Sequence, residues 1–428
     1  MKGNTVMLRK TLFDILVQLS GAGALGIKCP LLCKQDNEIL HLATEQHVLP
    51  LLACAALRSP GQLFHDDVEN YLLELMRTQA AKNLLRNQRV LHLIKEMENA
   101  GFSIIVLKGC SVSYLYAYPE SRDSVDVDLL IKPEQEHEVY RFLRQYGFSI
   151  SGRTMTANDS VCEHKKYGRI EIHVSLYPEI TKTAWKRIDE ESFLPRECTV
   201  RIDTPNGSFE TLGHTEQLIF LSLHMAKHFV ESGMTIRMML DIALHYARYK
   251  NEIDTGRYWH LLKKLHLDSY IACVLWILVQ NKVFAEADFP GLVRVDDSQI
   301  DAVISDVFQG GYMGAKEAQE RHEAGMEYHR QLMLKTQSRV RYKIYMLGWK
   351  IRSGISNMFP SYTKLKKLYP IVVCVPAMAS LMWVYHVILF PYKKIKSGVL
   401  RKDIRSEMDT MHEVSRQRMK LFKRLSML

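Results

Sequence analysis

Two apolar segments that meet charged residues most constrain what this 428-residue chain can fold into. The first segment, residues 103–107, is followed directly by Lys108. The second, residues 125–131, carries carboxylates at the alternate positions Asp126 and Asp128. Because successive side chains on a strand point to opposite faces, the two carboxylates share one face and their apolar neighbours share the other. The pattern predicts a pair of strands, one of which presents two acids side by side.

The neighbouring carboxylates point to a metal site. Two acids on one face repel each other unless a cation lies between them. Mg²⁺ prefers oxygen ligands and is commonly bound by protein carboxylates together with substrate phosphates. A third predicted strand, residues 168–174, adds Glu171 to the same kind of face. Asp126 and Asp128 could bridge two Mg²⁺ ions about 4 Å apart, and Glu171 could complete the acceptor-side ion and help to deprotonate an acceptor hydroxyl. The pattern therefore favours transfer of a nucleoside monophosphate from a triphosphate. A lone Asp-x-Asp is more often a solvent-facing pair, but Glu171 on a later strand shifts the balance toward the metal.

The residues after the first strand fit a phosphate site. Lys108 supplies a cation, and Gly109 lets the backbone approach a ligand closely. A helix expected over residues 111–117 begins at Ser111 and offers backbone N–H groups. Arg122, in the turn before the acid strand, is a candidate for a phosphate contact or for fixing that strand.

Periodicity divides the chain into four regions. Residues 1–100 form an N-terminal helical region, and 101–212 an α/β core. Residues 213–310 form a helical domain that packs on the core, and 311–428 a basic helical C-terminal region. We expect helices over residues 8–19, 39–56, 71–99, 133–146, 214–229 and 237–249, with helical patterns on to about 280 and from 312 to 356. Breaks are expected at Gly21–Gly23, Pro30 and Ser59–Gly61, and the helix over 71–99 is expected to end at the C-cap signal Ala100-Gly101.

The C-terminal region contains an unusual apolar segment, residues 369–392, with no charged residue and lysines on both flanks. Its length would reach across a bilayer, which needs about 20 apolar residues, but Pro376 interrupts it. An interfacial or re-entrant membrane element, a buried helix and a true span all stay open. Residues 401–428 form an amphipathic basic helix candidate that suits an anionic membrane surface.

Charge and cysteine usage set the broad class. The formal net charge is +10, and much of the basic excess follows Arg339, which suits an anionic partner or a solvated helix face. The eight cysteines are scattered without zinc spacing, as expected for free thiols in a reducing compartment. The first residues mix charged and apolar side chains too early for a signal peptide. We expect a cytoplasmic protein, with peripheral attachment at the inner face of the membrane as an open alternative.

Several motifs together resemble a known family. They are Leu107-Lys108-Gly109, Tyr116, Arg122, Asp126 to Ile131, Glu171-Ile172-His173, His47 to Leu52, and the helical residues His224, His228, Arg237 and Asp241. This set is similar to the uncharacterised nucleotidyltransferase family of the polymerase-beta superfamily, the type that often accompanies polysaccharide biosynthesis genes. The resemblance covers about residues 40 to 250.

The resemblance implies a minimal α/β (α+β) nucleotidyltransferase core with a mixed sheet, embedded in a largely helical protein. It also implies an enzyme of EC 2.7.7 type that uses magnesium and a nucleoside triphosphate. The chain departs from the family pattern at two positions: Cys110, not serine, follows Gly109, and Val125 precedes the first aspartate.

Other residues have competing interpretations. His224 and His228 lie one helical turn apart, a spacing that zinc uses, but no glutamate completes the His-Glu-x-x-His pattern. His173 could orient Glu171, touch substrate or be a satisfied core histidine. Arg237 either pairs with Asp241, one turn further on, or approaches a phosphate. Like His173, the residues His224, His228 and Asp241 are candidate substrate contacts.

The leading hypothesis is nucleotidyl transfer to a small molecule, a glycan precursor or a protein. The alternative is a non-catalytic nucleotide-binding or scaffold protein of a membrane-associated polysaccharide-synthesis system. A nucleic-acid acceptor is less favoured, because aromatic residues are not interleaved with basic ones in any RNA-binding module.

Overall fold

The computed structural model describes residues 2–31, 37–124, 126–151, 159–176, 198–310, 321, 324–329, 331, 369, 378–387 and 415–428. The main helices are α1 (Lys2–Leu25), α2 (Asn37–Glu45), α3 (Leu49–Arg58), α4 (Asp66–Asn99), α5 (Cys110–Ser113), α6 (Glu136–Gln145), α9 (His214–Glu231), α10 (Ile236–Arg248), α11 (Thr255–Lys264), α12 (Asp268–Gln280) and α13 (Asp297–Gly310). Short 3-10 turns are η1 (Pro119–Ser121), η2 (Pro133–Gln135) and η3 (Glu286–Asp288). The strands are β1 (Ile104–Lys108), β2 (Asp126–Ile131), β3 (Ser149–Ile150), β4 (Asp159–His164), β5 (Gly168–His173), β6 (Thr199–Thr204) and β7 (Gly207–Leu212).

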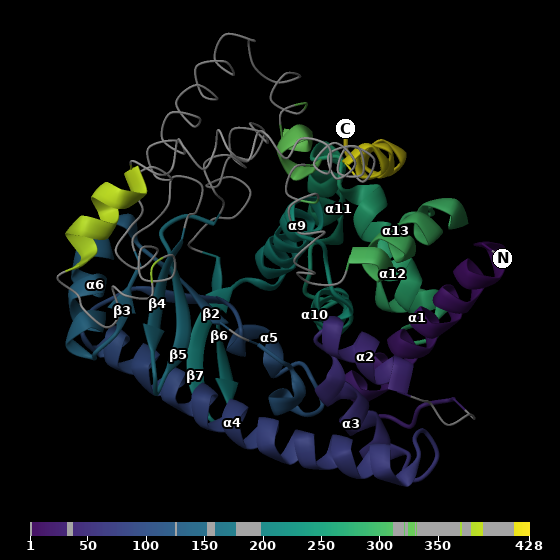
Figure 1. Ribbon diagram of the computed structural model, residues 1–428, viewed down its shortest axis with the longest axis horizontal. Coiled ribbons are helices and arrows are strands. Elements are labelled where there is room, and N and C mark those ends of the chain that lie inside the picture. Colours follow the sequence, from purple (N-terminus) through teal and green to yellow (C-terminus); the bar gives the residue numbers. More distant parts are fainter. Residues whose placement is uncertain are drawn as a thin grey trace.

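The central sheet has the strand order β1-β2-β5-β4-β3 and is mixed. Strands β2 and β5 run parallel, and the other neighbours run antiparallel. Asp128 lies opposite Glu171 in the parallel pair, and Asp126 lies opposite Arg169. Because partners on adjacent strands point the same way, all of these charged side chains share one face. The predicted fold class, an α/β core with a mixed sheet in a largely helical protein, is confirmed (Figure 1).

The opposite face of the sheet is buried. Val127, Leu129 and Ile131 are at most 1% exposed and belong to a core with side chains of α4 and α6. Helix α4 runs along the whole length of the sheet and on to the N-terminal helices (Figure 1). The alternation of β2 thus leaves its acids on the face that α4 does not cover.

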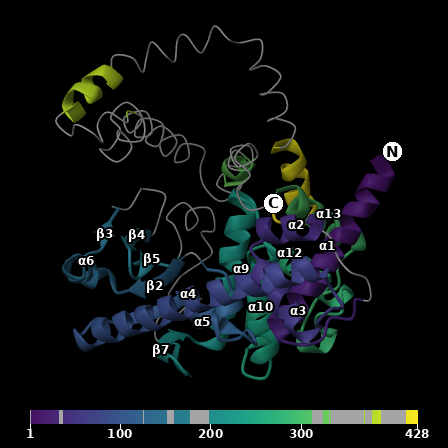
Figure 2. The same ribbon diagram turned by 60° about the horizontal axis from the view of Figure 1, so that its bottom comes forward.

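The helical part holds the second core, built mainly from α1, α3, α9, α10 and α12, which lie together at one end of the molecule (Figure 2). Two buried side chains join the end of β1 to its surroundings, one from the β6–β7 hairpin and one from the helical part. Thr211 of β7 donates to the carbonyl of Val106 at 2.7 Å, and Gln217 of α9 donates to that of Leu107 at 2.7 Å. The end of β1, where Lys108 lies, is therefore held next to the start of α9.

The predicted helix break at Gly21–Gly23 is wrong, because these residues lie inside α1. A Cβ on Gly23 would lie 1.9 Å from the carbonyl oxygen of Leu51, and one on Gly21 would lie 2.3 Å from Val283. The glycines therefore allow α1 to pack closely against neighbouring elements, where larger side chains would collide.

Several element boundaries also differ from the prediction. The helix expected over residues 39–56 divides into α2 and α3 at His47, whose φ is 54°. The helix expected over 111–117 is shorter, ending at Ser113. Strands β3, β4, β6 and β7 were not predicted; β6 and β7 form a separate hairpin. Helix α4 ends at the predicted signal: Ala100 is its C-cap, and Gly101 follows with φ 88°.

The last residues, 415–428, pack onto the helical part. Phe422 is fully buried, and its ring meets Phe229 and Tyr328 edge-on, with centroids 5.7 and 5.2 Å away. Arg418 is buried as well and donates to the carbonyl of Phe229. The apolar side of this segment, expected to suit lipid, thus contacts the protein itself.

No helix among the described residues is long and apolar enough to cross a bilayer. Most of the helical pattern over 312–356, all of the segment 401–414 and most of the apolar segment 369–392 lie outside the described residues.

Candidate active site

The acid face carries an ion-pair cluster at the junction of β1 and β2. The Lys108 ammonium lies 3.4 Å from Asp126 Oδ2 and 3.2 Å from Asp128 Oδ2. The Asp128 side chain is 1% exposed, whereas that of Asp126 is 24% exposed. Burial alone would lower the pKa of Lys108, but the nearby Asp128 and Asp126 carboxylates outweigh it and raise that pKa. The sequence predicted Lys108 as a phosphate contact; here its ammonium is the cation between the two acids.

His173 lies against the other side of Asp128, with Nε2 2.9 Å from Oδ1. Burial would raise the pKa of Asp128, but the Lys108 charge and the His173 hydrogen bond lower it to about 2. Asp128 is therefore ionised and accepts only, so Nε2–H of His173 donates to it.

Glu171 completes the acid face from β5. Its Oε1 accepts a hydrogen bond from Arg169 Nη2 at 2.7 Å, and its side chain is 14% exposed. Ligand atoms of Asp128, Glu171 and His173 all lie within 4.8 Å of one another. Within the described residues this is the only such cluster of three or more ligand side chains. Asp126 shares the face but is not part of this cluster, whose third member is His173.

Gly109 keeps the backbone next to the acid strand. Its φ is 91°, and a Cβ there would lie 3.2 Å from Val127 Cγ2 and 3.4 Å from the carbonyl oxygen of Asp126. Ser111 follows in α5 and is 1% exposed, and its Oγ has no hydrogen-bond partner among the described residues. Only a residue without a side chain fits this turn unstrained, which explains the Lys-Gly sequence at the end of β1.

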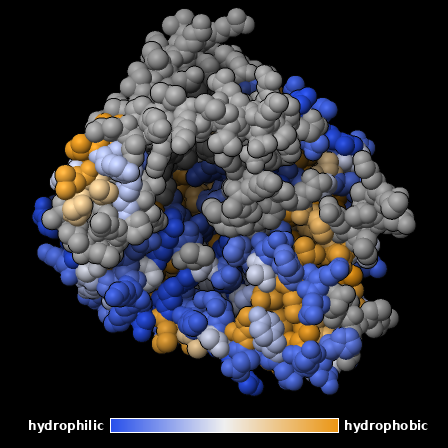
Figure 3. Space-filling view, in the orientation of Figure 1, coloured by the Kyte–Doolittle hydropathy of each residue, from blue (hydrophilic) through white to orange (hydrophobic). Residues whose placement is uncertain are grey.

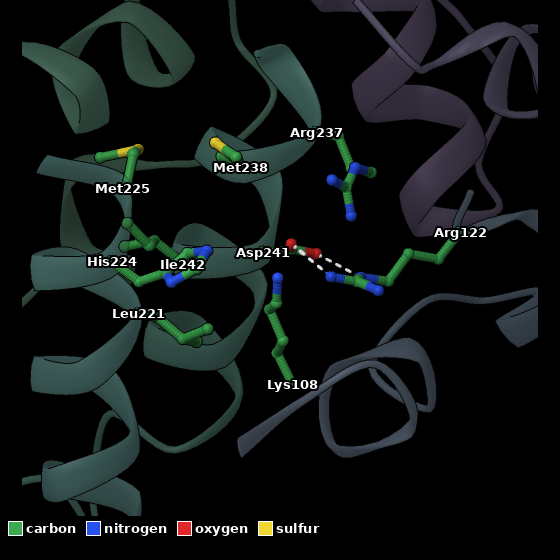
Figure 4. Close-up of a pocket in the computed structure, with 9 residues that line it drawn as sticks. All are labelled: Lys108, Arg122, Leu221, His224, Met225, Arg237, Met238, Asp241 and Ile242. Atoms are coloured by element: carbon green, nitrogen blue, oxygen red, sulfur yellow. Dashed lines mark hydrogen bonds and ion pairs between the residues drawn. The ribbon is translucent and has the colours of Figure 1, made fainter. Parts of the chain in front are cut away.

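A narrow pocket, partly open to solvent, lies beside the acid face. Its polar lining comes from Lys108, Arg122, His224, Arg237 and Asp241, and its apolar lining from α9 and α10. In Figure 4 the Lys108 and Arg237 side chains point from opposite sides toward the Asp241–Arg122 pair. The structure thus brings predicted residues from both the sheet and the helical part around one space.

Arg122 and Asp241 form a buried bidentate pair with N–O distances of 2.7 and 2.8 Å. Tyr116 also donates to Asp241, at 2.7 Å. Burial opposes the charge of Asp241, but the Arg122 guanidinium lowers its pKa below the ordinary value. Asp241 therefore pairs with Arg122, not with Arg237, and the pair fixes the turn before β2 to α10.

His224 and His228 stack edge-on on α9, with ring centroids 4.6 Å apart. Burial, reinforced by the nearby Lys108 charge, lowers the pKa of both, that of His228 to about 3. Both rings are neutral at physiological pH, and His224 lines the pocket. No described side chain joins them as a third metal ligand, so the structure gives no support to a zinc site there.

Two residues near the acids were not predicted. Arg86 of α4 donates through Nη1 to the carbonyl of Ser124, directly before the acid strand. Arg169 pairs with Glu171. Its position two residues before Glu171 on one strand could have indicated a shared face. Nothing in the local sequence around Arg86 distinguishes it from the other charged residues of a long helix.

The carboxylates on the sheet could bind a metal ion, and the basic pocket beside them could bind phosphate groups, a combination typical of proteins that bind metal–phosphate complexes. The chain matches the model of the family described as "Uncharacterised nucleotidyltransferase" over residues 33–281, more than half of its length, and belongs to this family. No curated protein matches the sequence.

Two solved structures are similar at low identity. One is titled "tRNA-processing enzyme (apo form I)"; the identity is 10%, the TM-score 0.22, and the match covers 77% of this chain and 97% of that one. The other is a tRNA nucleotidyltransferase complexed with a primer tRNA and an incoming ATP analog. Here the identity is 11%, the TM-score 0.21, and the coverage 72% and 98%.

Proposed function

We propose that this protein is a magnesium-dependent nucleotidyltransferase of the polymerase-beta superfamily. It moves a nucleoside monophosphate from a triphosphate to a small molecule, a glycan precursor or a protein. The observation that carries the proposal is the register of β2 with β5, which sets Asp126, Asp128 and Glu171 on one face with the cluster of ligand atoms around Asp128. Family membership supports the same chemistry.

The donor set fits a divalent ion. Asp128 is ionised, Asp126 is partly exposed beside it, and Glu171 lies across the strand pair. Carboxylate oxygens suit Mg²⁺ or Mn²⁺, and the His173 imidazole adds a nitrogen that Mn²⁺ tolerates better than Mg²⁺. Asp126 and Asp128 would hold two ions with the triphosphate, and Glu171 would hold the one on the acceptor side. Bound there, such ions would neutralise phosphate charge and lower the pKa of the acceptor hydroxyl.

The reaction exchanges one phosphorus–oxygen bond for another. The acceptor hydroxyl oxygen bonds to the α-phosphorus, and the bond from that phosphorus to the oxygen bridging to the β-phosphate breaks. Pyrophosphate leaves with that electron pair. The hydroxyl proton passes to Glu171 or to solvent, and Arg169 holds Glu171 in place.

The triphosphate would contact the residues around the end of β1. Gly109 and Ser111 allow its close approach to the backbone, and Lys108 and Arg237 supply positive charge from two sides. Arg122 holds the turn before the acids through Asp241. His173, His224 and His228 are then substrate contacts or supports of the site.

A labelling assay tests the activity. The protein is incubated with Mg²⁺, each α-labelled ribonucleoside triphosphate and a pool of sugars, glycan precursors, proteins and RNA. We expect label in an acceptor with wild type and none with Asp126→Asn. Equal labelling by the two proteins would contradict the assignment of the acids. Binding of nucleotide without transfer to any acceptor would favour a nucleotide-binding scaffold instead.

A helix over residues 379–387 favours placement at a membrane surface. It exposes Leu381 (60%), Trp383 (44%), Val384 (59%) and Tyr385 (49%), and apolar surface is visible at the position of this helix, at the upper left of Figure 3. Aromatic and aliphatic side chains without acids, flanked in sequence by lysines, suit the interface of an anionic bilayer. This feature fits a peripheral protein of a polysaccharide-synthesis system.

Co-sedimentation with vesicles tests this placement. We expect binding to vesicles that contain phosphatidylglycerol and a marked loss of binding in Leu381→Ser/Val384→Ser. The matched control is Leu57→Ser, because Leu57 is 48% exposed elsewhere on the molecule. Equal binding by all three proteins would contradict attachment through this helix.

A further inference from the structure

The Lys108 side chain contacts both the acid pair and the pocket. Its ammonium lies within 3.4 Å of both acids, and its side chain also lines the pocket on the other side. Figure 4 shows the ammonium directed toward the Asp241–Arg122 pair, with Arg237 on the opposite side of that pair. The same ammonium therefore contacts two sites. One is the acid pair, which would bind a metal ion, and the other is the basic pocket, which would bind an anion.

The pocket contains unsatisfied polar atoms. Nη1 of Arg122, Nε of Arg237 and Nε2 of His224 are buried and have no hydrogen-bond partner among the described residues. Buried polar groups are normally hydrogen-bonded, because burying one without a partner costs about 1–3 kcal/mol of stability. Atoms of this kind around one space indicate a ligand that the pocket is built to receive.

The charges define the ligand's class. Lys108, Arg122 and Arg237 bring three positive charges, and Asp241 brings one negative charge whose oxygens already accept from Arg122 and Tyr116. His224 is neutral, because burial first and then the Lys108 charge lower its pKa. The local excess of two positive charges suits a dianionic oxyanion, and guanidinium groups suit phosphoryl oxygens in particular.

We propose that Lys108 is a shared cation that couples metal binding on the acids to phosphoryl binding in the pocket. Without a metal, its ammonium is held by Asp126 and Asp128. When a divalent ion occupies the acids, this pairing is lost and the ammonium turns to the pocket, where it completes the oxyanion site with Arg237. Metal and phosphoryl group then strengthen each other's binding by the same factor. The inference rests on the assignment of the acids to a metal in the proposed function.

The coupling is measured with Mn²⁺ and inorganic phosphate on the full chain. Free Mn²⁺ is quantified by electron paramagnetic resonance, with and without phosphate. In wild type, saturating phosphate should lower the Kd of Mn²⁺ by about fivefold or more. In Lys108→Met, Mn²⁺ alone should bind at least as tightly as in wild type, because the ammonium that competes for the acids is gone. The effect of phosphate on Mn²⁺ binding should vanish. Lys132→Met, which removes an exposed lysine just after β2, should behave as wild type.

A second variant guards against misfolding of Lys108→Met. Arg237→Gln leaves the cation between the acids in place; it should leave the affinity for Mn²⁺ alone unchanged and weaken the effect of phosphate. Mn²⁺ binding without any effect of phosphate in wild type would overturn the coupling and leave the metal assignment standing. Coupling that survives in Lys108→Met would overturn the role of this lysine. Failure of wild type to bind Mn²⁺ would overturn both the coupling and the metal site of the proposed function.

Discussion

His173 donates a hydrogen bond of 2.9 Å from Nε2 to Asp128, which separates the roles of the two acids on β2. Asp128 is buried between His173 and Lys108. The side chain of Asp126 is 24% exposed and contacts Lys108 but not His173. The two aspartates look equivalent in the sequence, but they differ in how much the fold depends on them.

Asp126→Asn and Asp128→Asn should therefore differ in stability and agree in activity. Replacing Asp128 removes the main partner of a buried lysine, which costs about 3–5 kcal/mol. Replacing the more exposed Asp126 should cost about 1 kcal/mol or less. Urea unfolding of both variants measures the difference, and the labelling assay should find neither active. Equal stability losses would contradict the burial assigned to Asp128.

Gly109→Ala should destabilise the acid strand. The left-handed φ of 91° costs an alanine roughly 1–2 kcal/mol, and the new Cβ would also press on Val127 at 3.2 Å. Gly101→Ala is the matched control, because its φ is 88° and nothing lies within 4 Å of the added atom. Thermal unfolding should show a larger loss for Gly109→Ala. Equal losses would mean that the contact with β2 contributes nothing.

Asp241→Asn should weaken the junction between the sheet and the helical part. The change leaves Arg122 buried with an uncompensated charge, at a cost of about 3–5 kcal/mol. The control is Asp301→Asn, which removes an exposed pair whose side chains, Lys10 and Asp301, are 49% and 53% accessible; its loss should be about 1 kcal/mol or less. Comparable losses in the two variants, measured by urea unfolding, would contradict the structural role of the Arg122–Asp241 pair.

Acidification should destabilise the protein before its carboxylates titrate. Burial lowers the pKa of His245 from 6.5 to about 4, so between these values the unfolded state binds a proton that the folded state does not. Stability is full above pH 6.5 and falls as the pH drops toward 4, by up to roughly 3 kcal/mol for this residue. His245→Gln should flatten the fall between pH 7 and 4.5, as followed by urea midpoints. His41→Gln, at an exposed site, should not. An unchanged slope in His245→Gln would show that this histidine is not buried and neutral.

Phe422→Ala should destabilise the helical part, although it lies near the end of the chain. The ring is fully buried against Phe229 and Tyr328, and truncation of such a side chain costs about 3–5 kcal/mol. Lys420→Ala, at an exposed position of the same helix, should be neutral. Thermal unfolding distinguishes the two, and a neutral Phe422→Ala would contradict the packing of residues 415–428.

The sequence predicted those features that depend on short-range pattern. The alternation around Asp126 and Asp128 correctly predicted their shared face, and the apolar partners of β2 were correctly assigned to the other side. The Ala100-Gly101 signal correctly ended α4.

Features that depend on contacts between distant segments were not predictable in this way. Gly21 and Gly23 read as a helix break, yet they serve the packing of α1 against Val283 and Leu51. The pairing of Lys108 with the acids follows from the antiparallel register of β1 with β2, and no local rule sets that register. The pocket likewise depends on how α9 and α10 meet the end of β1.

Isothermal titration of the four ribonucleoside triphosphates tests the central claim most directly, with and without Mg²⁺, on wild type and on Asp126→Asn. This variant removes an acid with little expected effect on the fold. The account predicts that at least one triphosphate binds wild type in a Mg²⁺-dependent manner and that this dependence is lost in Asp126→Asn. Triphosphate binding that is indifferent to Mg²⁺, or that is the same in both proteins, would contradict it.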